Sequence, residues 1–217
     1  MRTIRVTGKA NMKVAPDQTK IELTIKGFAK LYSEALSKSV EDAKIIKDAI
    51  ASCGIDRDSL KTENFYTSEK TKSIKDQYGN TTYKQIGYDV THCMNFTFDN
   101  NNEILGKVLH VLSKLSINPR ISISYVVKDS EKYKDDLIAL AVKDAKRKAL
   151  AMANAAQVSL GDILNMDYSY QTVTFETREY LRMDSVMLAD STESFDVHML
   201  PEDMDLTDSV TITWEIK

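Results

Sequence analysis

The sequence predicts an α+β protein: an antiparallel or mixed sheet with a ferredoxin-like β-α-β-β-α-β core, extended by a third long Ala-rich helix and two closing strands. Segments in which apolar and polar residues alternate, typical of strands, are separated by segments with apolar residues every three or four positions, typical of helices. Between residues 17 and 127 these segments follow the order of a split β-α-β fold, with both helices on one face of the sheet. The 217 residues are 42% hydrophobic and 28% charged, so the chain can bury a core without a metal or disulfide.

Two strands are predicted at the start of the chain. Ile4 and Val6 alternate with polar residues, and we expect this first run to end at Gly8. After a Pro-Asp turn, residues 20–26 alternate in the same way. A period of two predicts strands with one buried face and one solvated face.

The first helix is predicted to begin at Ser33, a residue type common at N-caps, and to end near Cys53, where Gly54 is a natural stop. Its spacing predicts an inner face made of Leu36, Val40, Ala43, Ile46 or Lys47, and Ile50.

A long hairpin is predicted next. One strand covers 60–68, a polar stretch follows, Gly79-Asn80 turns the chain, and the second strand ends near Phe98. One face of that second strand is predicted to carry Tyr88, Val90, His92, Met94, Phe96 and Phe98.

Two further helices flank a short strand. Residues 100–102 are three asparagines that can cap the second helix, Asn118-Pro119 stops it, and residues 121–125 alternate as a strand. Ser130 opens the longest helix, which we expect to run to about Ala156. Its inner line has small side chains spaced by four, which permits close approach to a sheet or helix: Leu137, Ala141, Ala145, Ala149 and Ala153.

The C-terminal part is predicted to contain a strand over 163–174, with Tyr168 and Tyr170 on one face, and a last strand over 210–216. Between them, residues 184–208 contain eight acids and no Lys or Arg, while the rest of the chain carries a net charge of +5. The segment is predicted to be a solvated loop; the alternative is that it docks on a basic surface of a neighbouring subunit. A calcium loop is not supported, because the spacing and the central Gly of such loops are missing.

No motif for catalysis, cofactor binding or metal binding is found. Gly-x-Ser-x-Gly and Gly-rich phosphate loops are missing from the sequence, and His92, His110 and His198 are isolated from one another. His92 and its neighbour Cys93 are predicted to point to opposite faces of a strand, so they cannot form a thiolate–imidazole pair. Cys53 and Cys93 are expected to be reduced and buried. We therefore expect no catalytic residues, no cofactor and no metal.

Charge and hydropathy limit the partners. The net charge of −3 argues against a nucleic-acid-binding protein. The longest apolar run, Leu137 to Val142, is far shorter than a membrane helix, and the first residues lack the apolar stretch of a signal peptide. These observations predict a cytoplasmic protein without a membrane span.

Several segments, taken in order, resemble the SIMPL-domain family, also called domain of unknown function 541. The opening strand and turn match at Ile4-Arg5-Val6-Thr7-Gly8-Lys9-Ala10 and Val14-Ala15-Pro16-Asp17, followed by Ser33-Glu34-Ala35 at a helix start. Further similar segments are Cys53-Gly54-Ile55 with Leu60-Lys61-Thr62, Ile86-Gly87-Tyr88-Asp89-Val90, the Ala-rich residues 141–155, and Val210-Thr211-Ile212-Thr213-Trp214.

The resemblance covers essentially the whole chain and implies a single SIMPL-like domain over 1–217. A sub-division into a core, 1–127, and a part with the long helix, closing strands and acidic loop, 128–217, is compatible with it. The family implies an α+β protein that forms oligomers and has no established catalytic residues. Many members are periplasmic or outer-membrane immunogenic proteins of bacteria, and some are linked to stress protection.

Three hypotheses follow. The first is a non-enzymatic, self-associating protein, a homo-oligomer with a stress-related role. The second is a small-molecule binding module with a pocket between sheet and helices, lined by Tyr88, Phe96, Tyr125 or Tyr168. The third is an enzyme whose site converges only in the folded chain, around His92, His110 and nearby acids. An unknown protein partner is compatible with the first two.

Overall fold

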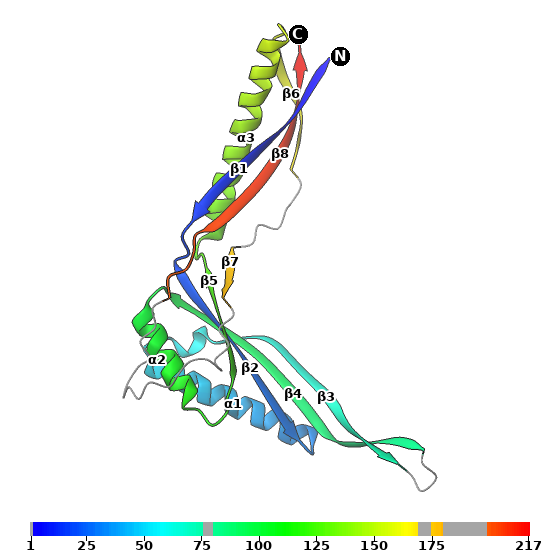
Figure 1. The fold of residues 1–217 in the computed structure, drawn as a ribbon, viewed down its shortest axis with the longest axis vertical. Helices are drawn as coiled ribbons and strands as arrows, with labels where there is room; N and C mark the ends of the chain where they lie inside the picture. The colour runs from blue at the N-terminus through cyan, green and yellow to red at the C-terminus, as the bar shows by residue number, and fades with distance from the viewer. Residues whose placement is uncertain (1, 76–79, 169–174, 180–198) are drawn as a thin grey trace. The chain divides into compact units, whose positions relative to one another are not determined.

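A computed structural model describes residues 2–75, 80–168, 175–179 and 199–217. The chain forms two compact units (Figure 1). The terminal unit, which holds both ends of the chain, contains residues 1–17, 126–177 and 201–217. The central unit contains residues 18–125 and 178–200. The predicted sub-division placed residues 1–127 together, whereas here the first 17 residues lie with the C-terminal part of the chain.

The central unit is built on a five-stranded sheet with the order β3-β4-β2-β5-β7. Without β7, this is the strand order of a ferredoxin-like fold, so the predicted β-α-β-β-α-β core is confirmed. The elements are β2 (Gln18–Ala29), α1 (Tyr32–Ser52), a 3-10 turn (Arg57–Ser59), β3 (Lys61–Lys75), β4 (Thr81–Asp99), α2 (Asn102–Ser113), β5 (Arg120–Val126) and β7 (Glu176–Glu179).

The core of this unit lies between the sheet and its two helices. Strands β2 and β4 pair antiparallel, and every second residue of each is buried: Ile21, Leu23 and Ile25 lie opposite Phe96, Met94 and His92. Helix α2 begins as predicted, because the Asn101 side chain accepts hydrogen bonds from the backbone N–H groups of Glu103 and Ile104 in the first turn.

The predicted inner face of helix α1 is confirmed in its second half, where Ile46 and Ile50 are buried, and is wrong at Val40, which is 71% exposed. Ala35, Ser39 and Ala49 are also buried. The helix is turned so that the Ser39 hydroxyl reaches His92 on β4, and a polar contact of this kind is invisible to an apolar-periodicity rule. Ser33 is not the N-cap; Leu31 occupies that position without a side-chain cap.

The hairpin also differs from the prediction. The stretch after residue 68, expected to be a polar connection, continues as strand β3 to Lys75 and pairs with β4 along its whole length. Its threonines and lysines are exposed on both faces, so hydrophobic alternation could not reveal it.

The terminal unit is a three-stranded sheet, order β1-β8-β6, covered on one face by helix α3. Its elements are β1 (Thr3–Val14), α3 (Ser130–Ala155), β6 (Leu160–Asp167) and β8 (Met204–Ile216). Strands β1 and β8 pair antiparallel from Thr3 opposite Glu215 to Val14 opposite Met204. Helix α3 runs along both of them, as Figure 1 shows.

The small-residue line of α3 is confirmed: Leu137, Ala141, Ala145, Ala149 and Ala153 are all buried. Strand β1 does not end at Gly8 but passes through it to Val14, which corrects the prediction. A Cβ at Gly8 would overlap the Ala141 carbonyl oxygen and lie 2.5 Å from the Ala145 backbone nitrogen. Gly8 is therefore a site of close helix approach within a strand.

The predicted acidic loop is shorter than expected. Residues 204–208 belong to β8, which begins six residues before the predicted strand, and Asp208 is buried with the Tyr168 hydroxyl donating to its carboxylate at 2.8 Å. Strand β6 occupies Leu160–Asp167, so it begins three residues before the predicted strand, and residues 169–174 of that prediction lie outside the described part of the chain. Tyr170 and residues 184–198 lie outside the described part of the chain.

Substitution of Gly8 by Ala is expected to lower the free energy of unfolding by about 3 kcal/mol, because α3 must move off the sheet to make room for one methyl group. Gly27→Ala is the matched control: a Cβ there meets nothing within 4 Å, and a change within about 1 kcal/mol is expected. Urea unfolding of the two variants checks this, and equal losses in both would contradict close packing at Gly8.

Candidate functional site

A buried polar cluster in the central unit is centred on His92. The Ser39 Oγ of α1 lies 3.0 Å from His92 Nδ1, and the Thr62 Oγ1 of β3 lies 2.9 Å from His92 Nε2. The Phe65 ring packs edge-on against the imidazole at 5.2 Å between centroids. His92 is only 7% exposed, and both of its ring nitrogens have hydroxyl partners, one on the buried Ser39 and one on the exposed Thr62.

Burial lowers the pKa of His92, and the hydrogen bond with Ser39 opposes this shift. The ring is therefore neutral at pH 7, with one nitrogen donating and the other accepting. A serine beside a histidine is the pairing of a nucleophile and its general base. Here, however, the third group is a hydroxyl in place of the usual carboxylate, and the serine side chain is buried. The arrangement is that of a satisfied polar network in a core.

A shallow pocket borders this cluster. It is lined by Ile25, Gly27, Phe28, Ala35, Lys38, Ser39, Asp42 and Val90. Burial raises the pKa of the Asp42 carboxyl, although the nearby Lys38 ammonium acts in the opposite direction.

The four aromatic residues predicted to line a ligand pocket do not gather in it. Phe96 and Tyr125 are buried in the core of the central unit. Tyr88 packs edge-on against Tyr32 at 5.5 Å, and Tyr168 belongs to the terminal unit. The pocket lining proposed from the sequence is therefore wrong for the pocket that is described.

The histidines do not converge on a metal among the described residues. His92 lies on β4, His110 lies in the last turn of α2, and His198 falls outside the described residues. Within 2–75, 80–168, 175–179 and 199–217, no three His, Cys, Asp or Glu side chains form a group that could hold a metal ion.

Both cysteines are free and half-buried, less buried than expected. Burial raises the pKa of the Cys53 thiol, so it is less reactive than an exposed thiol. Cys93 approaches Thr24 at 3.8 Å on the face of β4 opposite His92, as the alternation of a strand predicts.

Side chains of α3 cap part of the outer edge of β1 in the terminal unit. The Asp144 carboxylate accepts a hydrogen bond from the Lys9 backbone N–H at 3.0 Å, and Lys148 Nζ donates to the Thr7 carbonyl at 3.4 Å. Hydrogen bonds from Lys148, the Lys9 N–H and Arg147 hold the pKa of Asp144 well below its usual range. Two free backbone groups of an edge strand are thus satisfied within the chain.

The opposite edge, β6, is open among the described strands and apolar. Ile163, Leu164 and Met166 are 51%, 43% and 50% exposed. Ile163 and Met166 lie opposite Trp214 and Ile212 of β8, whose side chains are buried under α3. The apolar face of the sheet therefore continues past the cover of the helix to the last described strand of the sheet.

Sequence reasoning identified His92 but missed its partners Ser39 and Thr62, because nothing in the local pattern marks a serine as buried or a threonine as a partner of a histidine on the neighbouring strand. It also missed the two edges. A signal for the capped edge was present in the spacing of Asp144 and Lys148, which are four residues apart and so share one flank of a helix.

Among the described helices, none is long and apolar enough to cross a membrane.

The chain matches the model of the SIMPL family, described as a protein of unknown function (DUF541), over residues 4–214. It is also similar to the uncharacterized protein YggE of Edwardsiella ictaluri (strain 93-146). The two are 25% identical over 197 residues, which cover 88% of this chain and 78% of the relative. The resemblance found in the sequence segments is therefore confirmed.

The stability of the protein is expected to fall in mild acid because of His92. Its pKa in the folded chain is lowered from 6.5, so below about pH 6.5 the unfolded state binds the proton more readily and the free energy of unfolding decreases. Urea unfolding of the wild type and His92→Gln, between about pH 7.5 and about pH 5.5, measures this difference. A pH dependence that is the same in both proteins would contradict a buried neutral imidazole.

Proposed function

The chain belongs to the SIMPL family, and we propose that it is a non-enzymatic protein that acts by self-association through the open edge of β6. The observation that carries the proposal is the difference between the two edges of the terminal sheet. At one edge Asp144 and Lys148 bind two backbone groups of β1, while the other edge exposes three apolar side chains and pairs with no further described strand. An open apolar edge strand is a template for pairing with another chain.

The partner that fits this edge best is a second copy of the chain. An antiparallel pair centred between Ile163 and Leu164 brings these two residues of one copy opposite the same two of the other. In this register Asp162 lies opposite Asn165, and Asp167 lies opposite Leu160, so no acid faces another acid. A self-complementary patch of this kind forms a closed two-fold interface.

The polar network at His92 supports the non-enzymatic part of the proposal. Its hydroxyl and imidazole groups bind one another, Ser39 and His92 are buried, and the described pocket beside them is shallow. The proposal therefore uses no catalytic residue and no cofactor. It attributes the stress-related role to the assembly, and it places the protein in the cytoplasm.

Ile163→Lys/Met166→Lys is expected to shift the protein toward monomer, because each ammonium group would then lie in an apolar interface, opposite Leu164 or Gly161 of the other copy and with no acid opposite it. Both side chains are about half exposed, so the fold should tolerate the change. Asn11→Lys is the control, since Asn11 is exposed on the other edge strand, β1.

Native mass spectrometry at low and moderate salt measures the result. The proposal expects a discrete multimer for the wild type and for Asn11→Lys, and mainly monomer for the double variant. A wild-type monomer at all concentrations, or a double variant that assembles as the wild type does, would contradict it.

A further inference from the structure

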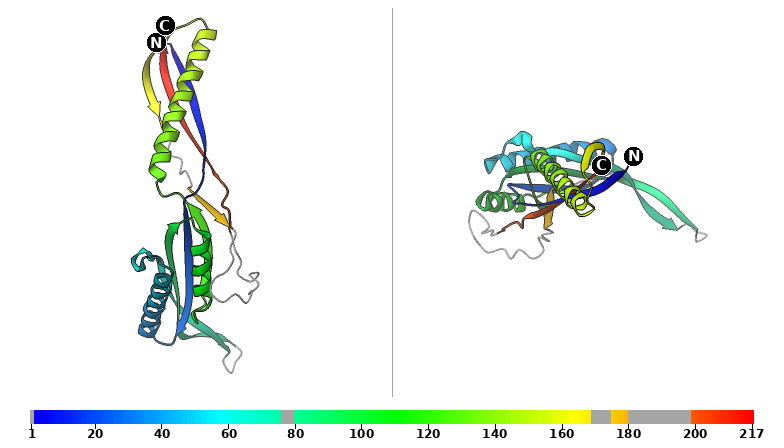
Figure 2. Two further views of the ribbon diagram at one scale, coloured as in Figure 1. Left: turned by 90° about the vertical axis from the view of Figure 1, so that its left-hand side faces the viewer. Right: turned by 90° about the horizontal axis from the view of Figure 1, so that it is seen from above.

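The far end of the hairpin in the central unit is a two-stranded ribbon. We call residues 70–75 of β3 and 81–86 of β4 the ribbon. The last β2 residue paired with β4 is Ala29, opposite Tyr88, so beyond that point β4 pairs only with β3 among the described strands. Figure 2 shows from two further sides that the hairpin continues past the end of β2.

The ribbon starts at a specific irregularity. Lys70 pairs with Gly87 and Thr71 pairs with Gln85, which leaves Ile86 as an extra residue in β4. A bulge of this kind bends and twists a strand pair. A Cβ at Gly87 would overlap the Ala29 carbonyl oxygen and the Phe28 ring, so the strands also pack very closely here.

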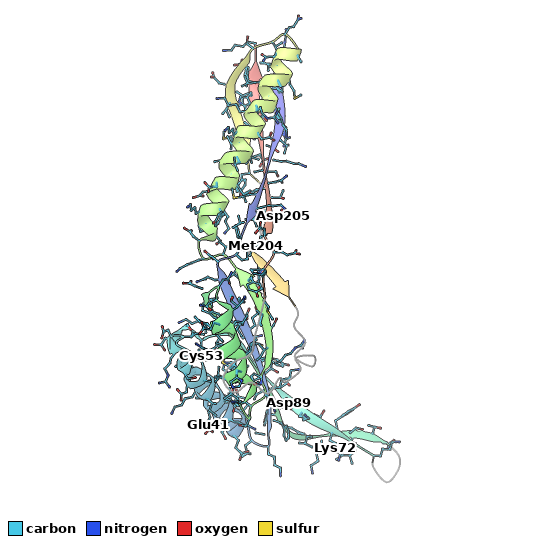
Figure 3. All side chains as sticks on the ribbon, turned by 60° about the vertical axis from the view of Figure 1, so that its left-hand side comes forward. Glu41, Cys53, Lys72, Asp89, Met204 and Asp205 are labelled. Atoms are coloured by element: carbon cyan, nitrogen blue, oxygen red, sulfur yellow. The ribbon has the colours of Figure 1, made fainter. Side chains whose placement is uncertain are left out.

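The ribbon carries four lysines and no acid. At its base Lys70 is neutralised: its Nζ lies 3.0 Å from an Asp89 carboxylate oxygen and 5.1 Å from the Phe28 ring centroid. Farther out, Lys72 and Lys84 lie directly opposite each other, and neither forms an ion pair with a described residue. Figure 3 shows Lys72 out along the hairpin, beyond Asp89. Like charges directly opposite each other on a strand pair are destabilising.

The ribbon also exposes apolar surface. Tyr83 is 74% exposed, Ile74 is 41% exposed and Ile86 is 38% exposed. A two-stranded ribbon alone in water is marginally stable. Exposed aromatic and aliphatic side chains, together with an unneutralised lysine pair, are therefore the features of a surface that is completed by an anionic, partly apolar partner.

We propose that the ribbon binds the acidic segment 184–203 of a second copy of the chain. This segment carries six acids, Asp184, Asp190, Glu193, Asp196, Glu202 and Asp203, and no Lys or Arg, so its charge is complementary to that of the ribbon. Twenty residues reach up to about 65 Å when extended, which is ample to follow a ribbon six residues long. The inference rests on the proposed self-association but uses a surface different from the β6 edge.

The first experiment cross-links carboxylates to amines with a carbodiimide, in a mixture of ¹⁵N-labelled and unlabelled wild-type protein. Cross-links from Lys72 or Lys84 to acids in 184–203 are expected to join labelled with unlabelled chains. Cross-links confined to one chain, or none at concentrations where the protein is assembled, would overturn the inference.

The second experiment exchanges the charges. Lys72→Glu/Lys84→Glu is expected to weaken assembly about tenfold at low salt, and addition of Asp190→Lys/Glu193→Lys in the same chain is expected to restore it. Lys44→Glu, on the exposed side of α1, is the control and should assemble as the wild type does.

The outcomes separate this inference from the proposed function. If the wild type is monomeric at all concentrations, the proposed self-association itself fails. If it assembles but Lys72→Glu/Lys84→Glu assembles equally well, only the ribbon contact fails. Binding of a mixed-sequence DNA duplex at physiological salt by the wild type, and not by Lys72→Glu/Lys84→Glu, would assign the ribbon to nucleic acid and overturn the inference.

Discussion

The close contact between Gly8 and the alanines of α3 is the constraint on which the terminal unit depends. The helix backbone meets the strand backbone with no side chain between them, because Ala141 and Ala145 face a residue that has no Cβ. Only at this separation can Asp144 and Lys148, on the flank of the helix, reach the backbone of β1. One packing contact therefore both closes the core and caps part of an edge of the sheet.

The two edges of the terminal sheet differ in how far side chains of α3 cap them. A sheet of three strands has two edges, and the helix flank can cap only the one beside which it lies. Strand β6 stays uncovered among the described elements and carries its apolar residues to the edge. In the central unit the ribbon repeats the pattern, with lysines opposite each other and an exposed tyrosine where the sheet has ended. The apolar edge of β6 and the lysine-bearing ribbon are the two exposed surfaces that support assembly of the chain with further copies.

The fold was predictable from the sequence where burial follows a simple period. The alternation of Ile21, Leu23 and Ile25 located β2, and the alanines spaced by four located the inner line of α3. Prediction failed where a polar group decides the packing: Ser39 replaces Val40 on the inner face of α1 because its hydroxyl meets His92. It also failed at Gly8, since a glycine in a strand can mark either an end or a close approach, and the alanines that approach it, Ala141 and Ala145, are distant in the sequence.

The candidate site was less predictable than the fold. His92 was read correctly as a packed histidine, but its hydroxyl partners come from a helix and a neighbouring strand that only the fold brings together. The exposed edge could not be predicted from composition, because the exposure of Ile163 and Met166 depends on how far across the sheet helix α3 reaches. The lysine pair of the ribbon depends on a register that a single bulge sets.

Amide hydrogen exchange of the terminal sheet at low and high protein concentration reports on pairing through β6. If chains pair there, the β6 amides become protected as concentration rises, while the Lys9 amide is protected equally at both concentrations by Asp144. Exchange in β6 that does not depend on concentration, in a protein that nevertheless assembles, would contradict the claim that this edge is where the chains pair.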